Sequence, residues 1–206
     1  MLAVSKGRSA SAVRMLTRLG VENFGENYLQ EAEPKLEVLA GTELTWHYLG
    51  RLQANKTRVV AERFAWVHGL DRLRIAERLS AQRSAAAAPL NVCVQVKLAD
   101  IEARSGVGSA EVIALAGAVA ELPQLRVRGL MCMLPEGLNA QRQLEAFGEV
   151  RSLYEQLNRS GAQLDTLSMG MSGDFPSAIA AGSTMVRIGT ALFGAAPTSN
   201  ASPLPP

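Results

Sequence analysis

The chain has 206 residues, 48% of them hydrophobic, which predicts a single domain with a sizeable core. Its 21 basic and 19 acidic residues leave a net charge of +2, which gives no electrostatic basis for binding nucleic acid or a membrane surface. No apolar run reaches transmembrane length, and Met1 leads directly into a strand-like run without a charged leader, so we expect a cytosolic protein.

Short apolar segments alternate with amphipathic segments along the whole chain. The predicted strands cover residues 2–6, 22–25, 46–50, 64–68, 91–98, 126–133, 165–169 and 185–189. Strict alternation of strands and helices predicts a parallel sheet with the helices outside it. Eight repeats predict closure into a (β/α)8 TIM barrel, and an open doubly wound sheet is the main alternative.

Helical patterns lie between the strands. In the first, Val13, Leu16 and Leu19 share one face and Gly20 follows as a stop signal. The longest pattern spans 144–157. The residues that we expect to begin three further helices are Asp71, Ser109 and Asp174.

About 200 residues is the lower limit for such a barrel, so the loops must be short and no second domain fits. We assign 1–194 to the barrel. The segment 195–206 is rich in Pro, Ser and Ala, and we expect it to be a disordered tail.

Lys6 ends the first predicted strand, and functional groups of such barrels lie where strands end. A partly desolvated lysine has a lowered pKa and attacks a carbonyl as the free amine, whereas a solvated surface lysine is the ordinary alternative. Asn27 follows the second strand and either caps the next helix or places its amide in the pocket.

The remaining polar and sulfur-containing residues indicate less. The chain has two histidines, His47 and His68, so a His-based metal site is not expected, and His47 is read as a core or interface residue. Cys93 and Cys132 lie in apolar strands and are expected to be buried, reduced thiols.

The segment from Ser168 to Thr190 is the most specific local signal. Glycines let the backbone approach an anion closely, and Ser168 and Thr190 add hydroxyl donors beside Gly189. Arg187 lies in an apolar strand, where its charge must be paired or must point at a ligand. An amine at one end of the chain and an anion-binding segment at the other suggest a phosphorylated aldehyde held as a Schiff base.

Several segments together resemble the pyridoxal phosphate homeostasis proteins (the YggS/PROSC family), which share the barrel of the alanine racemase N-terminal domain. The segments that carry the resemblance are AVSK at 3–6, FGENYLQE at 24–31, WHYLGRLQANK at 46–56, VHGLD at 67–71, RGLMCM at 128–133 and SMGMSGDFPSAIAAGSTMVRIGTALFG at 168–194. The similarity spans nearly the whole chain to Gly194.

The resemblance implies that pyridoxal 5′-phosphate (PLP) is the cofactor and that Lys6 forms a Schiff base with it. It also implies a phosphate site made of Ser168, Gly189 and Thr190, with Asn27 lining the ring pocket and Arg187 facing the pyridine nitrogen. The implied function is to store or deliver PLP within the cell and to influence the balance of amino acids and keto acids, without efficient catalysis. The implied partners are PLP and PLP-dependent apo-enzymes, and we expect a monomer.

An arginine at the pyridine nitrogen supports this expectation, because it disfavours protonation of the ring and weakens the ring as an electron sink. The alternatives are a PLP-dependent racemase-like enzyme and a Schiff-base aldolase. The racemase needs a base near the substrate Cα; the candidates are His47, Tyr48 and His68.

The sequence departs from the family pattern in three places. Family members usually carry a helix and loop before the lysine strand, whereas Met1 lies five residues before Lys6. The N-terminal helix is therefore missing from this sequence: either the start is misassigned, the chain is a fragment, or the barrel lacks this helix. Lys97 stands where the family typically has Asn, and Arg104 stands where it typically has Lys. An arginine cannot form a Schiff base, which places any second lysine role in doubt.

Overall fold

The computed structural model describes residues 1–98 and 105–194. The expected disordered tail at 195–206 and the departure at Arg104 lie outside these residues.

The strands form one parallel sheet that curls into a barrel. In chain order they are β1 (Leu2–Val4), β2 (Asn23–Glu26), β3 (Thr45–Tyr48), β4 (Trp66–Leu70), β5 (Leu90–Lys97), β6 (Val107–Gly108), β7 (Leu125–Met131), β8 (Thr166–Ser168) and β9 (Arg187–Ile188). Their order in space is β8-β7-β5-β4-β3-β2-β1-β9, while β6 pairs only with β5. A parallel bridge between Ser168 and Met185 joins the two ends of this path, so the predicted eight-stranded (β/α)8 barrel is confirmed.

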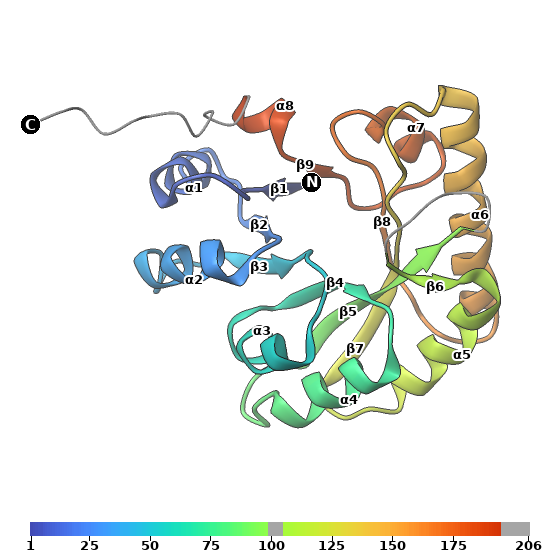
Figure 1. Ribbon diagram of the computed structural model, residues 1–206, viewed down its shortest axis with the longest axis horizontal. Coiled ribbons are helices and arrows are strands. Elements are labelled where there is room, and N and C mark those ends of the chain that lie inside the picture. The colour runs from blue at the N-terminus through green and yellow to red at the C-terminus, as the bar shows by residue number, and fades with distance from the viewer. Residues whose placement is uncertain (99–104, 195–206) are drawn as a thin grey trace, which may run out of the picture.

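The helices lie outside the ring of strands (Figure 1). They are α1 (Ala10–Thr17), α2 (Leu29–Val38), α3 (Thr57–Arg63), α4 (Leu73–Gln82), α5 (Ser109–Ala120), α6 (Ala140–Arg159), α7 (Phe175–Ala180) and α8 (Thr190–Phe193), with a 3-10 turn, η1, at Ala54–Lys56. No helix among the described residues combines the length and hydropathy that crossing a membrane requires.

All eight predicted strands are present with ends shifted by a few residues. The short strand β6 was not predicted, because two residues carry no periodic signal. It pairs Val107 with Val96 and Gly108 with Lys97, so the unusual Lys97 ends β5 as an exposed residue of the sheet.

Helix boundaries differ more from the predictions. The helix α1 ends at Thr17, so Leu19 does not share the buried face of Val13 and is 79% exposed. Gly20 does stop this helix, with φ +84° and Val21 N–H bonded to the Leu16 carbonyl.

Of the three predicted helix starts, only Asp174 occupies the N-cap position. Arg72 and Gly108 hold this position in α4 and α5, where no side chain caps the helix. Asp71 instead forms an ion pair with Arg72.

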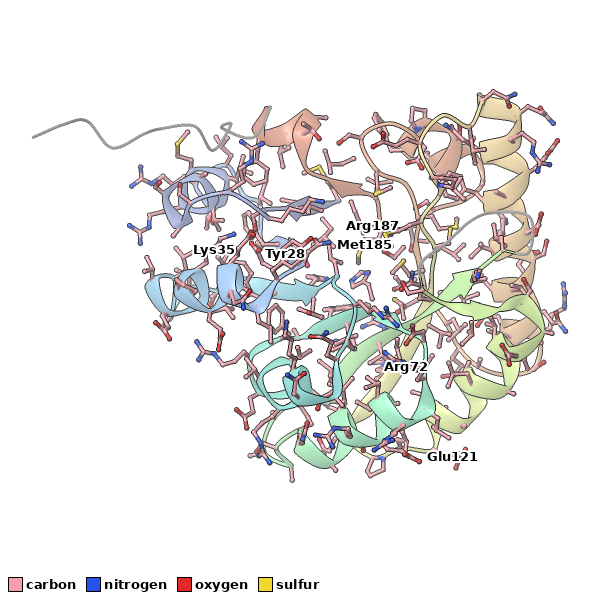
Figure 2. All side chains as sticks on the ribbon, viewed as in Figure 1. Tyr28, Lys35, Arg72, Glu121, Met185 and Arg187 are labelled. Atoms are coloured by element: carbon pink, nitrogen blue, oxygen red, sulfur yellow. The ribbon has the colours of Figure 1, made fainter. Side chains whose placement is uncertain are left out.

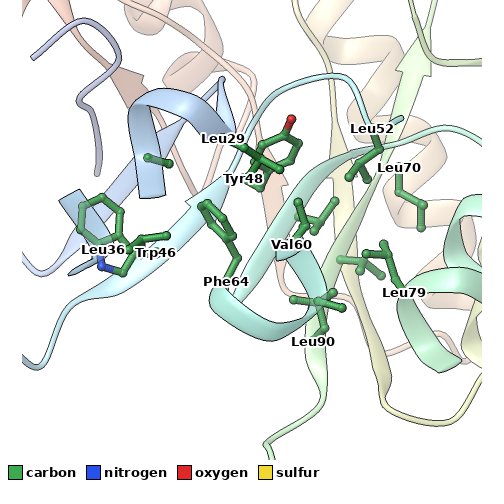
Figure 3. Close-up of a cluster of buried hydrophobic side chains, with 14 of the residues drawn as sticks. Leu29, Leu36, Trp46, Tyr48, Leu52, Val60, Phe64, Leu70, Leu79 and Leu90 are labelled. Atoms are coloured by element: carbon green, nitrogen blue, oxygen red, sulfur yellow. The ribbon is translucent and has the colours of Figure 1, made fainter. Parts of the chain in front are cut away.

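Two apolar layers between the barrel and its helices make up most of the core. The larger one joins β1–β5 to α1–α4, and Figure 3 shows part of it, in which Tyr48, Phe64 and Leu79 are almost fully buried. The second joins β5, β7 and β8 to α5–α7. The strand residues in these two layers face outward, toward the helices. Because side chains alternate along a strand, the residues between them point into the barrel. The buried polar residues of β3, β4, β5, β8 and β9 include His47, His68, Gln95, Ser168 and Arg187.

Candidate functional site

A pocket of about 520 Å³ opens where the strands end. Lys6 follows β1, Asn27 follows β2, and Arg187 lies in β9 with Gly189 and Thr190 directly after it; all five line this pocket. The pocket therefore brings together five of the six predicted cofactor-binding residues, from opposite ends of the chain.

Lys6 is the lysine of this pocket. The chain has four lysines, at positions 6, 35, 56 and 97, and all four lie in the described residues. Only Lys6 belongs to the pocket lining. Its side chain is exposed, whereas Lys35 is buried against Glu26.

Asn27 contributes an oxygen without a partner. Its Oδ1 atom is buried, and no hydrogen-bond donor among the described residues reaches it. A buried acceptor left unpaired costs free energy, so such an atom at a pocket wall favours a ligand with a matching donor.

Ser168, the sixth predicted residue, does not line the pocket. Its side chain is fully buried inside the barrel, where Oγ accepts a hydrogen bond from Arg187 Nη1 at 2.8 Å. The same oxygen lies 2.8 Å from His68 Nδ1. Because side chains alternate along a strand, this serine points into the barrel, where its hydroxyl holds Arg187 in place. Its contact with a phosphate stays a prediction.

Ser172 lines the pocket instead and was not singled out from the sequence. It lies in the loop after β8, and its Oγ accepts a hydrogen bond from Ala191 N–H at 3.4 Å. This contact joins the loop to the segment of Gly189 and Thr190. Its position in the sequence could have identified it, because Ser168 lies within a strand, whereas Ser172 follows the end of that strand, where functional groups of such barrels lie.

Gly189 keeps this side of the pocket open. A Cβ atom built there would meet the Val4 carbonyl oxygen at 3.4 Å, an ordinary contact distance. The protein itself therefore does not exclude a side chain, and a glycine here leaves room for a ligand close to the backbone.

Arg187 is held in a fixed position inside the barrel (Figure 2). It is 4% exposed, and besides Ser168 Oγ it donates to the Ser168 carbonyl at 2.5 Å and to the Cys132 carbonyl at 2.8 Å. Burial lowers the pKa of Arg187, but a guanidinium stays protonated at neutral pH. Three of its five donors are used, so donors remain for a ligand in the pocket that it lines.

A line of hydrogen bonds runs behind Arg187. Asn23 Oδ1 lies 3.0 Å from His47 Nε2, and His47 Nδ1 lies 2.9 Å from His68 Nε2. With Asn23 Oδ1 as acceptor, His47 donates from Nε2 and accepts at Nδ1. His68 then donates from Nε2, and its Nδ1 accepts from the Ser168 hydroxyl. Both rings are thus neutral, with defined tautomers.

The electrostatics agree with neutral rings. Burial lowers the pKa of His47 to about 3, and the N-terminal ammonium contributes to this shift. Burial, together with His47 and Arg187, lowers the pKa of His68 well below its usual range. His47 also stacks on Trp66 with ring centroids 5.3 Å apart, so its reading as a core residue is confirmed.

Cys93 and Cys132 are free, buried thiols as predicted. Burial raises the pKa of each to about 12, so neither supplies a thiolate at neutral pH. Met133, which follows β7, also lines the pocket, whereas Gly50, which follows β3, does not.

The residues present fit PLP. The pocket volume lies within the range of about 300–1,000 Å³ typical of small-molecule sites. Its lining combines one primary amine, the unpaired oxygen of Asn27, hydroxyls of Ser172 and Thr190, and a buried cation. An aldehyde, a ring hydroxyl, a phosphate and a pyridine nitrogen each find a chemically suitable group among these.

Comparisons with known proteins agree with this geometry. The family model described as the alanine racemase N-terminal domain matches residues 1–197. A protein of Pseudomonas aeruginosa named pyridoxal phosphate homeostasis protein is 52% identical, over 95% of this chain and 84% of its own length. A protein of the same name from Escherichia coli K12 is 50% identical, over 95% of this chain and 85% of its own length.

Solved structures show the same fold. PipY of Synechococcus elongatus, determined with PLP bound, is 39% identical with a TM-score of 0.87, over 94% of this chain and 91% of that one. An alanine racemase of Clostridium difficile is 14% identical with a TM-score of 0.81, over 96% of this chain but 53% of that one. The likeness to the racemase concerns the fold alone.

Proposed function

The chain belongs to the pyridoxal phosphate homeostasis proteins, within the alanine racemase N-terminal domain family, and from this premise we propose that it binds PLP in the pocket around Lys6. The observation that carries the proposal is that Lys6 alone among the four lysines lines the pocket, which it shares with Arg187 and Thr190 from the adjacent strand β9 and its end.

When bound, PLP would supply an aldehyde that condenses reversibly with a primary amine, so that a C=N bond replaces the aldehyde C=O bond and the oxygen leaves as water with both amine hydrogens. Lys6 supplies that amine. Gly189, Thr190 and Ser172 would hold the phosphate, and the unpaired Asn27 oxygen would accept a hydrogen bond from the ring hydroxyl.

Arg187 would face the pyridine nitrogen, with Ser168 and the two histidines holding it in place. Its fixed positive charge opposes protonation of the ring nitrogen, which limits how far the ring withdraws electrons. The three candidate bases, His47, Tyr48 and His68, are buried and do not belong to the pocket lining. These features support storage or delivery of the cofactor without efficient catalysis.

We further propose a monomer in the cytosol that exchanges PLP with PLP-dependent apo-enzymes. The names of the relatives, which describe homeostasis, support this role.

The test is a PLP titration followed by visible absorbance, borohydride reduction and peptide mapping. We expect a new visible band and a reduced adduct on Lys6, and Lys6→Ala should abolish both, because the other three lysines lie outside the pocket. An adduct recovered on Lys56 or Lys97 would overturn the assignment. A chain that stays colourless with PLP would overturn the proposed function and favour an aldolase-like reading.

A further inference from the structure

The backbone around Lys6 forms a tight turn. Arg8 N–H donates to the Ser5 carbonyl at 3.0 Å, which places Lys6 and Gly7 at the two central positions. Gly7 has φ +67°, a left-handed conformation that glycine adopts without strain. The direction of the Lys6 side chain therefore depends on how firmly this turn is held.

One face of α2 holds the turn on both sides of Lys6. Glu31 accepts a hydrogen bond from Gly7 N–H at 2.7 Å, and Lys35 Nζ donates to the Ser5 carbonyl at 2.7 Å. Glu31 and Lys35 are four residues apart on one helix, which places them on the same face. Lys35, labelled in Figure 2, lies on α2 and through this bond reaches Ser5, directly after β1.

Glu26 completes the arrangement from the end of β2. Its Oε1 accepts from Lys35 Nζ at 2.7 Å and from Ser5 Oγ at 2.5 Å, and its side chain is fully buried. Burial raises the pKa of Glu26, while the bonds from Lys35 and Ser5 act in the opposite direction. A buried ion pair contributes little net stability, so the presence of the Glu26–Lys35 pair is better explained by the conformation that it holds.

The three contacts to Ser5 and Gly7 each involve an ionisable side chain, and the fourth bond joins Lys35 to Glu26. Hydrogen bonds to charged groups are shorter and stronger than neutral ones. These contacts hold the residue before Lys6 and the residue after it, but none of them involves the Lys6 side chain. The amine is left available while its backbone is fixed.

We propose that Glu26, Glu31 and Lys35, here called the turn clamp, are positioning residues that direct the Lys6 amine into the pocket. The inference rests on the proposed function, because it concerns how fast Lys6 reacts with an aldehyde ligand. A turn held less firmly lets the amine leave the reactive geometry, whereas none of the clamp hydrogen bonds involves Gly189 or Thr190, where a phosphate would bind.

The experiment compares a ligand that reacts with Lys6 with one that cannot. PLP forms the visible adduct, whereas pyridoxamine 5′-phosphate carries an amine in place of the aldehyde and binds without a covalent bond. For Glu31→Ala we expect adduct formation in stopped-flow absorbance to slow roughly ten- to hundredfold, the scale on which a misplaced reacting group loses rate. The affinity for pyridoxamine 5′-phosphate, measured by calorimetry, should not change.

Matched variants isolate the contact. Glu31→Gln keeps an oxygen that can accept from Gly7 N–H and should restore the rate. Glu37→Ala removes an exposed carboxylate from the same helix and should react as the unmodified chain does. Lys35→Met removes the buried contacts of Lys35 with the Ser5 carbonyl and Glu26, and its melting temperature is recorded. If this variant does not fold, the Glu31 variants alone test the proposal.

Two results would overturn the clamp: Glu31→Ala reacting as fast as Glu37→Ala, or Glu31→Ala losing pyridoxamine 5′-phosphate as well, which would indicate general damage to the pocket. Failure of the proposed function looks different, since the unmodified chain would then bind neither ligand.

Discussion

At the scale of single residues, His47 and His68 link protonation to stability. Both are neutral in the folded chain, whereas in the unfolded chain each takes up a proton near pH 6.5. Because the folded pKa values are lowered, the unfolded state binds more protons below pH 6.5, so the free energy of unfolding falls as the pH falls. For His47 this window extends from 6.5 to about 3.

We predict that each histidine lowers the free energy of unfolding by about 1.4 kcal/mol per pH unit below this threshold. Urea unfolding between pH 7 and pH 5.5 measures the slope. His68→Gln should show a shallower slope than the unmodified chain, since one proton uptake is lost. Equal slopes would show that His68 does not titrate in this way.

Asn27 provides a second prediction, in which stability and binding change in different directions. Its unpaired, buried Oδ1 costs the ligand-free protein about 1–3 kcal/mol, so Asn27→Ala should not lower its melting temperature. The same change removes the acceptor that we assign to the PLP ring and should weaken PLP binding about tenfold or more. Spectroscopic titration and thermal unfolding test both halves. If the variant binds PLP normally, Asn27 does not contact the ring.

At the scale of secondary-structure elements, the contact between β7 and β8 depends on one glycine. A Cβ atom at Gly129 would lie 1.6 Å from the Thr166 carbonyl oxygen, its partner in the adjacent strand. This strand carries Ser168 and therefore the support for Arg187.

We predict that Gly129→Ala costs at least about 3 kcal/mol, because backbone atoms rather than a flexible side chain must move. Gly148→Ala is the matched control. Gly148 lies within α6, and a Cβ atom added there would meet no atom within 4 Å beyond the backbone of its own helix, so alanine should stabilise the helix by up to about 1 kcal/mol. Urea unfolding of both variants gives the two values, and a Gly129→Ala variant as stable as the parent would contradict the structure.

At the scale of the whole molecule, the chain corresponds to 53% of the length of the alanine racemase that shares its fold. Its pocket combines a fixed cation with Lys6, while the buried histidines lie outside the lining. We predict that the PLP-loaded chain exchanges the Cα hydrogen of L-alanine for deuterium no faster than free PLP does, because the candidate bases His47, Tyr48 and His68 are buried outside the pocket lining. Proton NMR in D2O measures the exchange, with Lys6→Ala as a second control. Fast exchange that depends on Lys6 would instead indicate an enzyme.

The sequence by itself determined the strand–helix alternation and the (β/α)8 barrel, because periodic burial repeats over every element and does not depend on distant contacts. It also identified Lys6, Asn27, Arg187, Gly189 and Thr190 as candidates, since strand ends gather on one face of such a barrel.

Only the tertiary structure decided which way each side chain near a strand end points. The inward turn of Ser168, the pocket position of Ser172 and the contacts of α2 with the Lys6 turn depend on register and on residues far apart in the chain. A shift of one residue along a strand reverses the face of every side chain on it, and local composition does not fix that register.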